Sequence, residues 1–207
     1  MSKIFQIVVF ASGNGSNFKK IHQEILASNI NGNIGILISN NKQCGAVDYA
    51  TEHGIKCVIL DKKNEISENT FMQILEGYLP DLIILAGYLK LIPASVIRKY
   101  KHKIINIHPA LLPSFGGKGM YGSNVHKAVL ASKQITSGAT VHFVDEKYDH
   151  GQIIDQQEVQ VFPDDTAELL ARRVLEVEHL LYPRVVKACC EDRIIWEGDA
   201  PRIIPSK

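Results

Sequence analysis

Asn106 and His108 are the residues of this sequence whose types and spacing best suit acid–base chemistry. They end an apolar run, 104–108, that has the composition of a buried strand. Because side chains alternate along a strand, both should face the same side at its carboxyl end. Pro109 follows and restricts His108 to an extended backbone. An amide and an imidazole placed there can stabilise an oxyanion, although a histidine at a strand end is as often a satisfied structural residue.

Asp149 is the carboxylate expected to complete this group. It lies in a polar turn, 146–151, just beyond a second strand-like run, 139–144. A carboxylate beside an imidazole raises the pKa of the ring, which favours an imidazolium. We therefore predict that Asn106, His108 and Asp149 act together, without a serine or cysteine nucleophile and without a metal.

A glycine loop follows the first apolar run. Residues 13–17 read Gly-Asn-Gly-Ser-Asn, and a helix should open at Ser16. Unpaired N–H groups at a helix N-terminus attract an anion, so we predict a phosphate ester there. A dinucleotide fingerprint fits poorly, because Phe18 holds its third glycine position and no acidic residue ends the second strand. A tight turn with Ser16 as the N-cap stays open as the structural alternative.

The predicted fold is a Rossmann-like α/β domain. Short apolar runs alternate with stretches long enough for helices, which predicts a mostly parallel twisted sheet with helices on both faces. Two later strand-like runs, 139–144 and 152–161, predict an antiparallel extension in the C-terminal half, and a long helix should begin near Thr166. We expect residues 1–207 to form a single domain.

Composition narrows the classes of partner. The 23 Lys and Arg residues nearly balance the 22 Asp and Glu residues, so no net field favours nucleic acid or an anionic membrane. No run approaches the roughly 18 apolar residues of a membrane helix. The four cysteines lack the paired spacing of a zinc site or a redox motif, which predicts free thiols in a cytoplasmic protein. Small-molecule substrates are expected, and the oligomeric state stays open.

Five segments together resemble the phosphoribosylglycinamide formyltransferase family, in order and spacing over nearly the whole chain. They are residues 12–17 (SGNGSN), 85–88 (LAGY), 106–113 (NIHPALLP), 142–144 (HFV) and 149–151 (DHG). The resemblance implies the formyltransferase fold and 10-formyltetrahydrofolate as co-substrate. It also implies a catalytic group of Asn106, His108 and Asp149.

The resemblance extends to the two substrate sites. It implies that Gly15, Ser16 and Asn17 hold the phosphate of a glycinamide ribonucleotide, and that Glu178 holds its ribose. Glu178 lies beside the apolar stripe of the long helix, where a free carboxylate is costly, although an exposed flank is the alternative. For the folate pocket the resemblance implies two segments, 89–92 and 144–148. It also includes Asn106, shared with the reaction centre.

Several folate-site predictions carry alternatives. Leu89, Leu91 and Ile92 suit a pterin wall or an ordinary core. Lys90 and Asn64 stand where well-known bacterial relatives carry arginine, which alters any contact to the glutamate tail. His142 matches a family position and either supports the catalytic residues or packs in the core. The glycine-rich segment 116–122 is either a mobile flap or a flexible connection.

Rival functions share the same catalytic residues. Formyltetrahydrofolate deformylase replaces the amine with water, but such relatives usually carry an extra N-terminal domain. Methionyl-tRNA formyltransferase should carry a further C-terminal domain and a basic surface. Other formyltransferases of the same fold, such as those acting on sugar nucleotides, stay open. A non-enzymatic phosphometabolite-binding domain would leave the catalytic group without a purpose.

Overall fold

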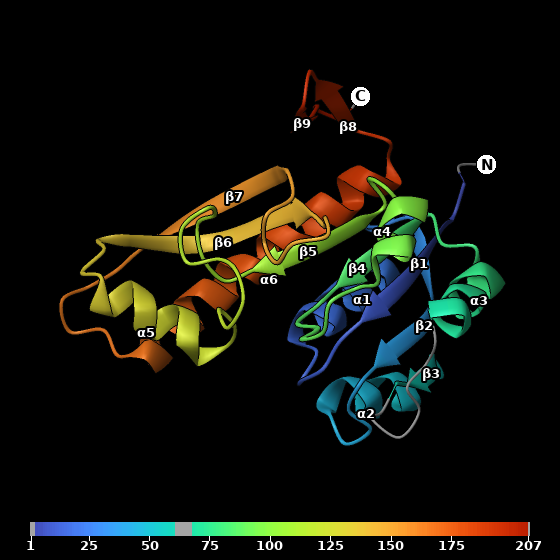
Figure 1. The fold of residues 1–207 in the computed structure, drawn as a ribbon, viewed down its shortest axis with the longest axis horizontal. Helices are drawn as coiled ribbons and strands as arrows, with labels where there is room; N and C mark the ends of the chain where they lie inside the picture. The colour runs from blue at the N-terminus through green and yellow to red at the C-terminus, as the bar shows by residue number, and fades with distance from the viewer. Residues whose placement is uncertain (1–2, 61–67, 207) are drawn as a thin grey trace.

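The computed structural model describes residues 3–60 and 68–206, which build a seven-stranded sheet (Figure 1). Across the sheet its strands are β3 (Lys56–Ile59), β2 (Gly32–Ser39), β1 (Phe5–Phe10), β4 (Leu82–Leu85), β5 (Ile104–His108), β6 (Thr136–Phe143) and β7 (Ile153–Gln160). The first five are parallel, whereas β6 and β7 pair antiparallel with their neighbours. The predicted mixed sheet is confirmed.

Helices cover both faces of the sheet because its parallel strands are apolar on both faces. In β1, Ile7 and Val9 pack in the core cluster that includes α1 (Ser16–Leu26), α2 (Gly45–Glu52) and α6 (Ala167–Cys190). Val8 and Phe10 pack on the other side with α3 (Glu68–Tyr78) and α4 (Ala94–Lys99). Each such side chain contributes about 1.5–3 kcal/mol when it is fully buried.

The long helix α6 begins where the sequence predicted it. The Thr166 hydroxyl caps it by accepting a hydrogen bond from Leu169 N at 3.3 Å. The predicted stripe is buried at Leu170, Val174 and Leu181, which bind the helix to the sheet. In Figure 1, α6 runs along β5 and β6. None of the helices in the described ranges is long and apolar enough to cross a membrane.

Two features were not predicted. The helix α5 (Ser123–Ala131) follows the glycine-rich segment, and a hairpin of β8 (Ile194–Glu197) and β9 (Ala200–Ile203) follows α6. The hairpin depends on distant contacts, because the Trp196 ring stacks on His102 at 4.1 Å and on Phe143 at 5.3 Å between ring centroids. Local patterns in the sequence do not carry that information.

Candidate active site

A cavity of about 530 Å³ lies at the carboxyl ends of β1, β4 and β5. This is the edge where parallel sheets of this kind bind ligands. The cavity brings together all the residues expected to catalyse or to hold the ribonucleotide. They are Gly15, Ser16, Asn17, Asn106, His108, Asp149 and Glu178.

The glycine loop points the N-terminus of α1 into this cavity. The helix begins at Ser16, and Gly15 before it has a left-handed φ of 67°, which disfavours any residue with a Cβ. A Cβ at Gly15 would also lie 2.7 Å from the Cβ of Ala46. Within the described residues no side chain caps α1, so the reading of Ser16 as an N-cap is wrong. The first-turn N–H groups are therefore left for an anion.

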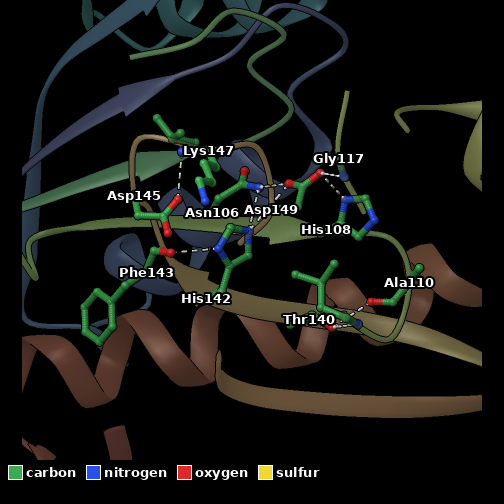
Figure 2. A network of polar contacts seen from close by, with 12 residues as sticks. Asn106, His108, Ala110, Gly117, Thr140, His142, Phe143, Asp145, Lys147 and Asp149 are labelled. Atoms are coloured by element: carbon green, nitrogen blue, oxygen red, sulfur yellow. Dashed lines mark hydrogen bonds and ion pairs between the residues drawn. The ribbon is translucent and has the colours of Figure 1, made fainter. Parts of the chain in front are cut away.

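The catalytic candidates converge as Figure 2 shows. His108 Nδ1 lies 3.5 Å from Asp149 Oδ2, and Asn106 Nδ2 lies 3.5 Å from Asp149 Oδ1. Asp149 has a left-handed φ of 52°, which costs a non-glycine residue about 1–2 kcal/mol. Gly117 N donates to Asp149 Oδ2 at 2.9 Å. The glycine-rich segment thus helps to hold the carboxylate in this orientation.

The protonation state of His108 differs from the sequence expectation. Burial of the ring lowers the pKa of His108 and outweighs the raising effects of the Asp149 charge and of the hydrogen bond to Phe115 O. The direction of this shift opposes the imidazolium expected from the sequence and favours the neutral ring in the unliganded protein. Its Nε2 lies 2.8 Å from the Phe115 carbonyl oxygen, which can only accept, so the proton resides on Nε2. His108 Nδ1 is then the atom that can take up a proton.

Asp149 stays ionised although most of its side chain is buried. Burial raises the pKa of Asp149, but the neighbouring His142 and His108 and the Gly117 N–H lower it more, and the net shift is downward. The carboxylate is thus ready to pair with a protonated His108. In the described ranges no three His, Cys, Asp or Glu side chains cluster as a metal site requires.

His142 orients the amide of Asn106. His142 Nδ1 lies 2.7 Å from the carbonyl oxygen of Phe143, so this nitrogen carries the proton. His142 Nε2 must then accept, and it lies 3.1 Å from Asn106 Nδ2. One Asn106 N–H is held by His142, and the other is directed to the Asp149 side of the cavity. His142 therefore contacts the catalytic candidates rather than only packing in the core.

Glu178 is buried, with 7% of its surface exposed. The alternative that Glu178 lies on the exposed flank of α6 is therefore wrong. Its Oε2 accepts a hydrogen bond of 2.6 Å from Asn17 Nδ2. Burial raises the pKa of Glu178 to about 7 despite that hydrogen bond, which lowers it. The Asn17 side chain thus binds Glu178, while its backbone N–H belongs to the uncapped first turn of α1. Asn17 Oδ1 is buried and has no partner among the described residues.

The two segments expected to bind folate meet beside the main cavity. Lys90, Leu91 and Ile92 line a second, narrow cleft of about 60 Å³ together with residues of the turn after β6, and Leu89 lines the main cavity. Leu89 and Leu91 are exposed, so the core alternative holds only for buried Ile92. Asn64 lies outside the described residues.

Sequence reasoning missed residues that support the site. Lys118, Met120 and Tyr121 line the cavity from the glycine-rich segment, whose composition was the only signal. The Thr140 hydroxyl donates to Ala110 O at 2.6 Å and accepts from Leu112 N at 3.1 Å, which braces the backbone that follows His108. Thr140 shares the strand face of His142, and that alternation could have indicated it.

Comparisons with known proteins agree with this geometry. A family model described as "Formyl transferase" matches residues 5–186. A chloroplastic phosphoribosylglycinamide formyltransferase of Arabidopsis thaliana is 47% identical over 207 residues, covering 98% of this chain and 71% of that protein. Among solved structures, glycinamide ribonucleotide transformylase 1 of Symbiobacterium toebii has a TM-score of 0.90 at 32% identity, covering 98% and 95% of the two chains. A formyltetrahydrofolate deformylase of Pseudomonas syringae pv. tomato has a TM-score of 0.88 at 25% identity, covering 98% and 67%.

Proposed function

This chain belongs to the formyl transferase family, and from that premise we propose that it transfers the formyl group of 10-formyltetrahydrofolate to the amine of 5-phosphoribosylglycinamide. The products are formylglycinamide ribonucleotide and tetrahydrofolate, a step of purine biosynthesis. One observation carries the proposal: an uncapped helix N-terminus, a buried carboxylate and a catalytic group share a single cavity. Together they match the phosphate, ribose and amine of one substrate.

In the proposed binding mode, the phosphate of the ribonucleotide lies at the glycine loop, and the ribose and the amine lie deeper in the cavity. Backbone N–H groups of Gly15, Ser16 and Asn17 hold the phosphate at the positive end of α1. Glu178 accepts hydrogen bonds from the ribose hydroxyls, and Asn17 fixes that carboxylate by its 2.6 Å hydrogen bond. The amine then lies toward His108 and Asn106, which line the same cavity.

The reaction needs a donor to the oxyanion and a proton acceptor. The neutral amine attacks the formyl carbon, and the N–H of Asn106 directed away from His142 stabilises the oxyanion. The amine proton passes to Nδ1 of neutral His108, directly or through a water, and Asp149 stabilises the imidazolium that forms. When the carbon–nitrogen bond to the folate breaks, that proton goes to the folate nitrogen. His108 is thus protonated during the reaction rather than before it.

Hydrolysis of the same donor is the second candidate, because the deformylase shares this fold. Water would then attack in place of the amine. The glycine loop and the Asn17–Glu178 pair favour transfer, because a deformylase needs no site for a ribonucleotide.

The test is to follow loss of 10-formyltetrahydrofolate with and without phosphoribosylglycinamide. Transfer predicts rapid loss only when the amine is present, together with one formylated ribonucleotide per folate released. Equal loss in water alone would assign the chain to the deformylases.

The remaining assignments follow from the same proposal. The 207 residues act as one formyltransferase domain in the cytoplasm on small-molecule substrates, with no metal and no nucleic acid in the reaction. The four cysteines are free thiols, as a reducing compartment favours.

A further inference from the structure

The glycine-rich segment carries a lysine on a turn that is bound to the catalytic candidates. Gly117 N donates to Asp149 Oδ2 at 2.9 Å, so the start of the turn is held by the Asp149 carboxylate (Figure 2). Met120 N donates to the Gly117 carbonyl oxygen at 3.0 Å, which closes a turn over residues 117–120. Lys118 is the first central residue of this turn, and it lines the main cavity.

Lys118 supplies the fixed positive charge of this cavity. Among the described residues it is the only lysine or arginine that lines the cavity, and its side chain is exposed. In the described ranges its ammonium group forms no ion pair. The same cavity contains the carboxyl groups of Asp149 and Glu178. The lowered pKa of His108 favours its neutral ring, so this ring adds no positive charge before the reaction.

The ribonucleotide of the proposed reaction brings further negative charge into the cavity. A phosphate monoester carries a charge of about −1.5 to −2 at pH 7, whereas the ribose and the attacking amine are neutral. The start of α1 offers backbone N–H groups and a dipole equivalent to about half a positive charge. These groups do not balance a phosphate beside two carboxyl groups. A lysine on a flexible four-carbon stem can bring its ammonium group to such an anion.

We propose that Lys118 binds the phosphate of the ribonucleotide from the glycine-rich segment and makes the enzyme select a phosphorylated amine. The inference rests on the proposed function. Lys118 is a specificity-determining residue here, because it acts on the phosphate and not on the reacting atoms. The turn thereby links the two ends of the substrate site, since the neighbouring Gly117 N–H holds Asp149.

The experiment compares kcat/KM for the amine substrate with and without its phosphate. Lys118→Gln should lower kcat/KM for the phosphorylated substrate about five- to tenfold, between the effects of an exposed ion pair and a charge-assisted hydrogen bond. It should leave kcat/KM for the dephosphorylated substrate and KM for the folate unchanged. Lys118→Arg keeps the charge and should retain most of the activity. High salt should reduce the difference between the unaltered chain and Lys118→Gln, because exposed charges are screened.

Calorimetric titration with inorganic phosphate measures the same contact without turnover, and Lys118→Gln should weaken this binding by a similar factor.

The matched control is Lys127→Gln, which removes the same charge from nearby α5. Lys127 is exposed and does not line the cavity, so its loss should leave phosphate binding and both kcat/KM values unchanged. The inference is overturned if Lys118→Gln lowers kcat/KM equally for the two substrates, or if the unaltered chain binds phosphate no better than Lys118→Gln. An effect of Lys127→Gln as large as that of Lys118→Gln would also overturn it. Absence of amine-dependent transfer in the unaltered chain would instead overturn the proposed function.

Discussion

Glu178 should make ribonucleotide binding depend on pH near neutrality. Burial raises its pKa to about 7, whereas hydrogen bonds donated by ribose hydroxyls favour the ionised carboxylate, which is the stronger acceptor. We therefore expect binding to release the Glu178 proton. For a group with this pKa, the ionised fraction falls about tenfold between pH 8 and pH 6, so the apparent dissociation constant should rise about tenfold. Glu178→Gln should bind more weakly at pH 8 and lose this dependence.

Calorimetry at pH 7, in two buffers of different ionisation enthalpy, measures the protons released on binding. Glu178 is about half protonated at its own pKa and should release about 0.5 proton per ribonucleotide. The substrate phosphate also titrates near pH 6, so Glu178→Gln provides the baseline and only the difference is assigned to Glu178. Equal proton release from the two proteins would refute the reasoning.

The raised pKa of Glu178 also predicts how the free energy of unfolding of the unliganded protein depends on pH. The folded state holds the Glu178 proton more tightly than the unfolded chain, so stability is lost as pH rises from the ordinary carboxyl value toward 7. The shift corresponds to about 3 kcal/mol. Urea unfolding should show the free energy of unfolding falling over this range relative to Glu178→Gln. A parallel pH dependence in both proteins would contradict the assignment.

Three further predictions concern the rest of the site. Asp149→Asn removes the charge that raises the pKa of His108, so the limb of the pH profile of kcat that reports His108 should move to lower pH. If that limb does not move, Asp149 does not influence the titration of His108. His142→Ala should release the Asn106 amide and lower kcat about tenfold or more. His142→Gln keeps a hydrogen-bond acceptor and should recover part of this loss. Equal losses in the two variants would show that His142 does not act by orienting Asn106. Gly15→Ala should cost about 1–2 kcal/mol of stability because of the left-handed φ at this position and the clash with Ala46. The same change should raise the KM for the ribonucleotide but not for the folate. A normal ribonucleotide KM would place the phosphate elsewhere.

The sequence predicted the parts of the fold and site that depend on local pattern. Strand alternation predicted that Asn106 and His108 lie on one face of β5, and the glycine loop predicted the start of α1 at Ser16. The pair of Asn17 and Glu178 joins residues 161 positions apart, so the sequence indicated the two members but not their hydrogen bond. The hairpin after α6 escaped prediction for the same reason, since its Trp196 packs against rings from other segments.

The protonation states could not be predicted because burial, which the fold alone determines, dominates them. Burial lowers the pKa of His108 and raises that of Glu178, and in both cases it outweighs the nearest hydrogen bond. In the proposed binding mode, the same cause produces a neutral base on the side of the amine and a carboxyl group with a pKa of about 7 on the side of the ribose. Asp149 escapes this effect because it receives hydrogen bonds and faces two histidines, so it stays charged and can stabilise the proton that His108 takes up. In the proposed mechanism, a nearly neutral chain tunes its acid–base groups through local burial rather than through its net charge.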